Sequence, residues 1–132
     1  MLLHKTLASL IIFAGTLFAV QPATSADLSG RWAGHWENNN NPHKGPLRAN
    51  LKQINSDQYR ATFSGRFFKV IPFRYKVTLD VVEEGPSYVR MSGRSRAGRQ
   101  SYQYTATSTG NSLVTHYSSK RYQGKFVLKR RR

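Results

Sequence analysis

Apolar and polar residues alternate one by one along most of the chain after residue 26. The clearest run is 73–81, where aromatic and aliphatic residues at odd positions alternate with charged and polar residues at even positions. A period of two places successive side chains on opposite faces of a β-strand. The pattern therefore predicts about eight strands and no helix. The other alternating runs are 27–37, 47–52, 59–67, 89–94, 102–106, 113–117 and 122–129.

Turn-forming residues punctuate the chain where these runs end. Short connections of this kind join consecutive strands as antiparallel neighbours. We therefore predict an all-β fold, a small antiparallel up-and-down barrel of about eight strands. The expected turns are NNNNPHKGP (38–46), NSD (55–57), IP (71–72), EEGP (83–86), RAG (96–98) and STGN (108–111).

The first 26 residues have the organisation of a secretory signal peptide. Lys5 supplies a basic start, residues 7–20 are mostly Leu, Ile, Phe and Ala, and QPATSA ends the segment with a proline and small residues. The apolar run is shorter than the roughly 20 residues that a transmembrane helix needs. We predict that 1–26 is cleaved and that 27–132 is a single β-barrel domain without a transmembrane span.

The chain contains no cysteine. Small secreted domains of eukaryotes usually carry disulfides. We therefore expect a bacterial exported protein, periplasmic or extracellular, that is held together by its core. The lack of thiols also excludes cysteine catalysis and zinc sites built on cysteine.

Ser-Gly-Arg occurs three times, at 29–31, 64–66 and 92–94, and Gln-Gly-Lys at 123–125 is a close variant. In each, the alternation puts the glycine on the apolar face and the cation on the polar face. Glycine within a strand permits the sharp bends of a closing sheet. The spacing is unequal, which argues against an internal repeat, so we interpret the motif as a device for closing a barrel.

The first expected strand, LSGRWAGHW, alternates glycine and tryptophan on one face and contains G-x-W at 30–32. This opening resembles that of calycin-type barrels, which include lipocalins and avidins. In lipocalins a basic residue from near the chain end packs across the tryptophan, and the resemblance implies Arg121, Lys125 or Lys129 in that role. The chain is shorter than lipocalins and lacks their terminal helix, and no biotin site is carried over from avidins. The chain is also similar to small basic secreted bacterial proteins that share this opening and the segment VIPFRY. This second resemblance implies no activity.

The interior of the predicted barrel is rich in aromatic residues. An eight-stranded barrel is just wide enough for side chains or for one small ligand. We expect the rings to fill the core, and the alternative is a cavity with a polar, tyrosine-rich mouth, because each buried hydroxyl needs a partner. Besides Tyr59, Tyr75 and Tyr117, the predicted interior includes the candidate ligand-binding residues Trp32, Trp36, Tyr102, Tyr104 and Tyr122.

Catalytic patterns are sparse. Glu83 and Glu84 are neighbours in a turn, so their side chains diverge, and neither a nucleophile motif nor a phosphate loop is present. His35, Glu37 and His43 could meet as metal ligands near the first loop, but they also fit exposed polar residues beside it. We favour that second interpretation and predict no enzyme, no catalytic residue, no metal and no cofactor.

The net charge of +15 becomes +14 when the predicted signal peptide, with Lys5, is removed. A strongly basic surface attracts anionic polymers or membranes. Nucleic acid is the usual partner of a basic barrel rich in aromatic residues, but export argues against it. The predicted anion-binding surface consists of Arg31, Arg66, Arg74, Lys76, Arg94 and Lys125, with the KRRR tail adding further charge.

Three functions are compatible with these features. The first is a non-enzymatic binding protein whose cationic exterior engages an anionic envelope component, which would be a polysaccharide, lipopolysaccharide or phospholipid headgroup. The second is a calycin-like carrier of a small apolar or aromatic ligand inside the barrel. The third is an inhibitor of an exported hydrolase. We predict the first, with the other two as alternatives.

Overall fold

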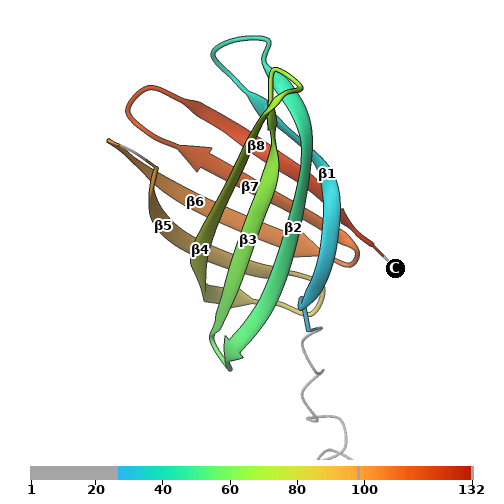
Figure 1. Cartoon of the computed structure of the whole chain (residues 1–132). Coiled ribbons are helices and arrows are strands. Elements are labelled where there is room, and N and C mark those ends of the chain that lie inside the picture. The colour runs from blue at the N-terminus through green and yellow to red at the C-terminus, as the bar shows by residue number, and fades with distance from the viewer. Residues whose placement is uncertain (1–26, 98, 132) are drawn as a thin grey trace, which may run out of the picture.

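The computed structural model describes residues 27–97 and 99–131, so the predicted signal peptide lies outside the described residues (Figure 1). Each strand pairs antiparallel with the next, and β1 also pairs with β8, which closes the barrel. The predicted all-β up-and-down barrel is thereby confirmed. The described residues include no helix long and apolar enough to cross a membrane. The strands are β1 (Gly30–Asn38), β2 (Lys44–Asn55), β3 (Gln58–Phe67), β4 (Ile71–Glu84), β5 (Val89–Ala97), β6 (Gln100–Thr109), β7 (Ser112–Ser118) and β8 (Gln123–Arg130).

The barrel has two different ends. The loops β1–β2, β3–β4, β5–β6 and β7–β8 lie at one end, which we call the open end. The other three connections lie at the opposite, closed end, together with the start of β1 and the end of β8 (Figure 1). The strand alternation runs between these ends, so inward-facing residues of different strands are stacked in layers along the barrel.

Two expected turns are placed differently in the structure. The first loop spans only 39–43, because β2 already begins at Lys44. The β3–β4 turn falls at 68–70, and Ile71 and Pro72 are the first residues of β4. A proline is tolerated there because Pro72 pairs with Arg66 of β3 on one side only, so no second strand needs its missing N–H.

The pairing between β4 and β5 is incomplete. Residues 79–84 of β4 pair with 89–93 of β5, whereas 71–78 of β4 and 94–97 of β5 have no register with each other. Toward the open end the two strands diverge in Figure 1, which leaves a seam in the barrel wall. The open half is therefore less constrained by strand pairing than the closed half.

The closed end is sealed around Trp32. This indole is fully buried and donates its N–H to the carbonyl of Leu28 at 3.0 Å. The guanidinium of Arg130 lies 4.5 Å from the centroid of the ring and donates to the carbonyl of Ser29 at 3.0 Å. A basic residue near the chain end thus packs across the tryptophan, as the calycin resemblance implied.

The expectation of Arg121, Lys125 or Lys129 in that role was wrong. Lys125 and Lys129 lie on the outward phase of β8, and Arg121 belongs to a loop at the open end. Arg130 continues the inward phase of Phe126 and Leu128, which brings its side chain over the closed end.

Gly65 and Gly93 of the Ser-Gly-Arg motif and Gly124 of its Gln-Gly-Lys variant lie where neighbouring strands approach closely, whereas Gly30 does not. A Cβ added to Gly93 would be 2.6 Å from the carbonyl oxygen of Thr78, and one added to Gly124 would collide with the carbonyl oxygen of Glu37. The cation that follows the glycine points outward in both cases, because Arg94 is exposed and Lys125 reaches Glu37 on the surface. This arrangement supports the motif's interpretation as a device for closing the barrel.

Candidate functional site

The open half of the barrel contains a cavity of about 590 Å³. Two of its lining residues, Tyr104 and Phe126, pack against the fully buried Phe63 with centroid distances of 6.3 and 4.9 Å. Below Phe63, aliphatic side chains fill the closed half. The expected filled core is thus correct for the closed half and wrong for the open half. The filling side chains include Leu28, Leu51, Ala61, Val77, Leu79, Met91, Ala106, Leu113 and Leu128.

Inward side chains become small along β5 toward the open end. Val89 and Met91 fill the barrel near its closed end, but the next inward positions toward the open end are Gly93 and Ser95. The β4–β5 seam lies beside these small residues. Neither Gly93 nor Ser95 lines the cavity, but the hydroxyl of Ser95 shares a hydrogen bond with that of Tyr104, which does.

Two walls of aromatic rings line the cavity. One wall runs from Trp36 to Phe67 (5.1 Å between centroids) and from Phe67 to Phe73 (4.6 Å). It ends at Tyr75, which stacks on Phe73 at 5.4 Å. These residues come from β1, β3 and β4, and consecutive rings are in contact, so the wall is continuous.

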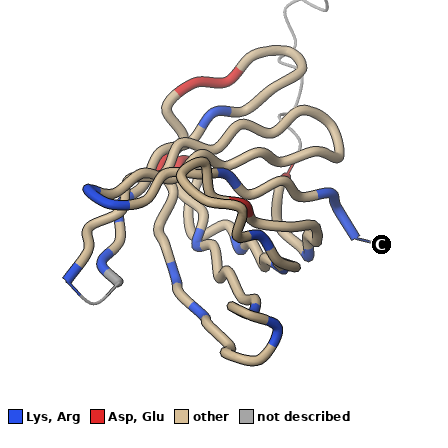
Figure 2. The backbone as a smooth tube through the Cα atoms, turned by 90° about the horizontal axis from the view of Figure 1, so that it is seen from above, with Lys and Arg blue, Asp and Glu red and all other residues tan. Residues whose placement is uncertain are grey.

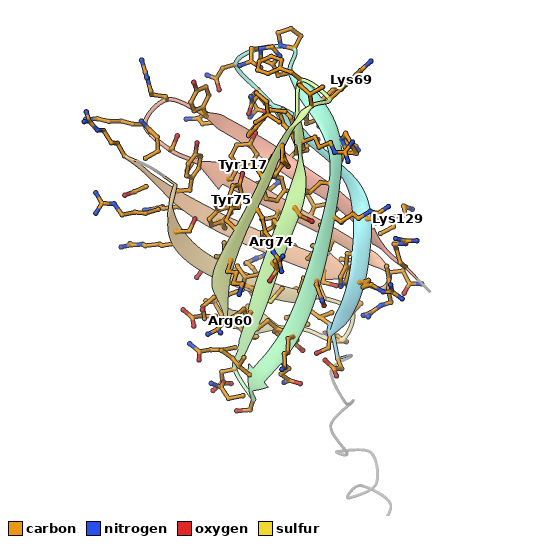
Figure 3. All side chains as sticks on the ribbon, in the orientation of Figure 1. Arg60, Lys69, Arg74, Tyr75, Tyr117 and Lys129 are labelled. Atoms are coloured by element: carbon orange, nitrogen blue, oxygen red, sulfur yellow. The ribbon has the colours of Figure 1, made fainter. Side chains whose placement is uncertain are left out.

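The second wall comes from β6, β7 and β8. Tyr102 lies 6.3 Å from Tyr104 and 6.2 Å from Tyr117, and Tyr117 lies 5.0 Å from Phe126. Figure 3 shows Tyr75 of the first wall and Tyr117 of the second wall inside the upper part of the barrel. A flat apolar molecule would contact rings on both sides.

The tyrosine hydroxyls of the two walls fall into two classes. Tyr104 shares a hydrogen bond of 2.8 Å with Ser95, and Tyr117 donates to the carbonyl of Glu37 at 3.0 Å and contacts the side chain of Asn38. For Tyr75 and Tyr102, no hydrogen-bond partner of the hydroxyl exists within residues 27–97 and 99–131. These two hydroxyls are free to bond a ligand.

Burial changes the acidity of these tyrosines. It raises the pKa of the Tyr75 hydroxyl above its ordinary value, and the nearby hydroxyls of Tyr104 and Tyr102 raise it further. Burial also raises the pKa of Tyr117 and of Tyr104, although the hydrogen bond between Ser95 and Tyr104 opposes the shift at Tyr104. Tyr75, Tyr104 and Tyr117 are therefore neutral at physiological pH.

Trp36 adds one more polar group to the first wall. Its side chain is buried, and its indole N–H has no hydrogen-bond partner among the described residues. A buried donor without a partner is uncommon in folded proteins. Trp36 thus contributes an apolar ring to the first wall and a hydrogen-bond donor without a partner beside the cavity.

Basic residues surround the cavity mouth. Lys44, Arg66 and Lys69 line it together with His43, and none of the residues that line the cavity is Asp or Glu. The nearest strand carboxylate, Glu37, faces outward and pairs with Lys125 at 3.4 Å. The mouth therefore carries a local positive charge in front of an apolar interior.

The structure brings most of the predicted interior residues together. Trp36, Tyr102, Tyr104 and Tyr122 all line the cavity. Trp32 does not, because it lies in the closed end beneath Arg130.

Sequence reasoning left out other wall residues from its candidate site. Phe67, Phe73 and Phe126 belong to the walls, as do Tyr75 and Tyr117. All five have the inward phase, and each lies within a few residues of an open-end loop. Distance from those loops is the signal that would have selected them.

The six predicted anion-binding residues do not form one cluster, and of them only Arg66 also lines the cavity mouth. Arg31, Arg66, Arg74 and Lys76 are exposed on the outer faces of β1, β3 and β4, whereas Arg94 projects from β5. Lys125 is half-buried and paired with Glu37. Figure 2 shows that basic positions surround the barrel and that acidic positions are few.

The residues that the sequence allows but does not favour as metal ligands are separated by the fold. His35 lies on the outer face of β1, whereas the ring of His43 in the first loop packs against Phe68 at 5.1 Å. In the part of the chain that the structure describes, no group of three His, Cys, Asp or Glu residues is placed to hold a metal ion.

Neither a protein-family model nor a curated protein matches the sequence. The chain is similar in structure to mFAP1, a redesigned β-barrel bound to DFHBI, with a TM-score of 0.61, 10% identity, and coverage of 79% of this chain and 94% of that chain. It is also similar to a de novo designed fluorescence-activating β-barrel, with a TM-score of 0.55, 14% identity, and coverage of 80% of this chain and 94% of that chain. At these identities the likeness shows the fold alone.

Proposed function

We propose that this chain is a non-enzymatic binding protein that holds one small ligand in its open-end cavity. The ligand has an aromatic or apolar body and an anionic group. The observation that carries this proposal is a cavity of about 590 Å³ with two aromatic walls and a basic mouth. Pockets for small molecules commonly have volumes of roughly 300–1,000 Å³ and apolar walls with a few polar groups.

The walls determine the body of the ligand. Rings such as Phe73 and Phe126 offer flat apolar faces, and burial of apolar surface supplies most of the binding free energy. The free hydroxyls of Tyr75 and Tyr102 then orient the ligand through hydrogen bonds. The similar barrel mFAP1 is bound to DFHBI, which supports ligand binding by this fold.

The mouth determines the charge of the ligand. Lys44, Arg66 and Lys69 line it without a carboxylate, so an anionic group there gains attraction and a cationic group is repelled. An acidic group at one end of an aromatic body would place the body between the walls and the charge at the mouth.

A matched pair of fluorescent probes tests both parts of the proposal. N-phenyl-1-naphthylamine has an apolar aromatic body, and its 8-sulfonate adds an anionic group. We expect both probes to bind at one site per chain, and the sulfonate to bind about tenfold more tightly at low salt, since each nearby cation contributes on the order of 1 kcal/mol at the surface. The advantage of the sulfonate should shrink in high salt and in Arg66→Gln.

The two tryptophans locate the bound probe. The chain has two tryptophans, Trp32 and Trp36. Of these, only Trp36 lines the cavity. In Trp32→Phe, the remaining Trp36 fluorescence should be quenched when the probe binds. In Trp36→Phe, the Trp32 fluorescence should be quenched less, because Trp32 lies at the closed end, farther from the probe. Stronger quenching of Trp32 than of Trp36, or no saturable binding of either probe, would contradict a ligand site at the open end.

The cationic exterior supports a second proposal, which is adhesion to an anionic envelope polymer. The outward positions of β2 and β3 include Arg48, Lys52 and Arg60 and no carboxylate. Binding of the purified protein to lipopolysaccharide should fall steeply with salt and should weaken in Arg48→Gln with Arg74→Gln. Binding to lipopolysaccharide that is unaffected by salt and by the two substitutions would exclude electrostatic adhesion. Export itself and inhibition of a hydrolase stay predictions from the sequence.

A further inference from the structure

We propose that the open end of the barrel docks on the surface of an anionic phospholipid bilayer, with the β3–β4 turn inserted between the headgroups. This inference does not depend on the identity or the existence of a cavity ligand. It rests on an unequal distribution of apolar side chains, of charges and of backbone strain between the two ends of the barrel.

Exposed apolar side chains are concentrated at the β3–β4 turn. Phe68, Val70 and Ile71 are 68%, 75% and 53% exposed, and they lie within four consecutive residues. Tyr122 of the β7–β8 loop, also exposed, lies at the same end. Contiguous exposed apolar residues mark interaction sites more often than isolated ones do, so this turn is the strongest apolar feature of the described surface.

The carboxylates avoid this end. Five of the six lie in the closed half of the barrel, and the sixth, Glu37, pairs with Lys125. All four open-end loops or their flanks carry basic residues. Figure 3 shows one of them, Lys69, near the tip of the β3–β4 turn. The open-end basic residues are Lys44, Arg66, Lys69, Arg96, Arg99, Lys120 and Arg121.

The backbone conformation of the β3–β4 turn is unfavourable for the residue types that occupy it. The N–H of Val70 donates to the carbonyl of Phe67 at 3.1 Å, and both central residues have positive φ, 51° at Phe68 and 66° at Lys69. Positive φ at both positions matches a type I′ turn, for which Asn-Gly is strongly preferred. Strained backbone of this kind is retained chiefly at functional sites.

A bilayer surface is the partner that fits both chemistries at once. Apolar side chains such as Phe68 and Val70 insert at the boundary between headgroups and acyl chains, while flanking lysine and arginine side chains contact anionic headgroups. A nucleic acid would satisfy the cations but would offer little to the aliphatic side chains of Val70 and Ile71. The combination therefore favours lipid.

Vesicle co-sedimentation of the unloaded protein tests the proposal. We expect binding to vesicles of phosphatidylcholine with phosphatidylglycerol and little binding to pure phosphatidylcholine. Phe68→Asn with Val70→Thr keeps every charge and should weaken binding at least about tenfold, because the inserted apolar area is lost. Its matched control is Ile54→Asn with Val82→Thr, which removes exposed apolar residues from the closed end and should change binding less than about twofold.

A second pair of variants separates oriented docking from general adsorption. Arg66→Gln with Lys69→Gln removes two charges at the open end, and Lys52→Gln with Arg60→Gln removes two at the closed end. Figure 3 shows Lys69 and Arg60 at opposite ends of the barrel. The open-end pair should weaken binding about tenfold or more, since each basic residue near the surface contributes about 1 kcal/mol. Equal losses of vesicle binding from the two pairs of variants would overturn the proposal. It would also be overturned if the protein did not bind vesicles, or if Phe68 mediated self-association instead of lipid binding.

Discussion

The guanidinium of Arg130 lies over the indole of Trp32 at 4.5 Å and joins the last strand of the barrel to the first. It also donates to the carbonyls of Ser29 and Asp27, each at 3.0 Å. One side chain thus caps the core, satisfies two carbonyl groups of the segment that enters β1 and supports closure of the barrel.

Arg130→Ala should lower the free energy of unfolding by about 2–4 kcal/mol, because it removes a cation–π contact and two charge-assisted hydrogen bonds. Urea denaturation measures the loss. Lys129→Ala is the control, since Lys129 is the exposed neighbour on the outward phase of β8, and it should change stability by less than about 0.5 kcal/mol. Equal effects of the two variants would contradict a structural role for Arg130.

The β3–β4 turn should become more stable when its central residues match its backbone. Phe68→Asn with Lys69→Gly should raise the free energy of unfolding by about 1 kcal/mol, since these residues accept positive φ at low cost. Thermal or urea unfolding checks this. If the variant is less stable than the parent, the positive φ values are not a source of strain, and the turn's unusual residues need another explanation.

Gly124 is required for the close approach of β1 and β8. In Gly124→Ala the new Cβ would collide with the carbonyl of Glu37 and the hydroxyl of Tyr117, so we expect a loss of about 3 kcal/mol or more. Gly110→Ala is the comparison, because Gly110 has a φ of 62° and open space around it. That variant should lose only about 1 kcal/mol, from backbone strain alone. Similar losses for both would argue against tight packing at Gly124.

Alkaline pH should destabilise the barrel through its buried tyrosines. The folded state holds the proton of Tyr75 more tightly than the unfolded state, whose tyrosines ionise near the ordinary pKa of 10.0. Stability is therefore fully present below about pH 10 and falls as pH rises toward the higher folded pKa, at up to about 1.4 kcal/mol per pH unit for each such tyrosine. Tyr75→Phe should make this fall shallower in urea titrations between pH 9 and pH 11, and an unchanged slope would contradict burial as the cause.

The period-two alternation was sufficient to predict the strands and their inward faces, because side-chain direction in a strand is a local property. Residues 73–81, for example, lie in β4 with Val77 and Leu79 buried and Arg74 and Lys76 exposed, as the pattern predicts. Turn positions were predicted less well. Phe68 and Lys69 form a turn without any turn-forming residue, so composition pointed instead to Ile71 and Pro72.

The local sequence pattern could not predict that the interior is divided into a filled half and a cavity. Trp32 and Trp36 have the same phase on the same strand and differ only in their depth along the barrel, yet one is capped by Arg130 and the other lines the cavity. That difference depends on which residues of distant strands share a layer of the barrel. The sequence by itself determined the strands, their faces and the net charge. Only the tertiary structure decided where the rings gather, where the cations meet them and which end stays open, because these depend on strand register and closure between residues far apart in the chain.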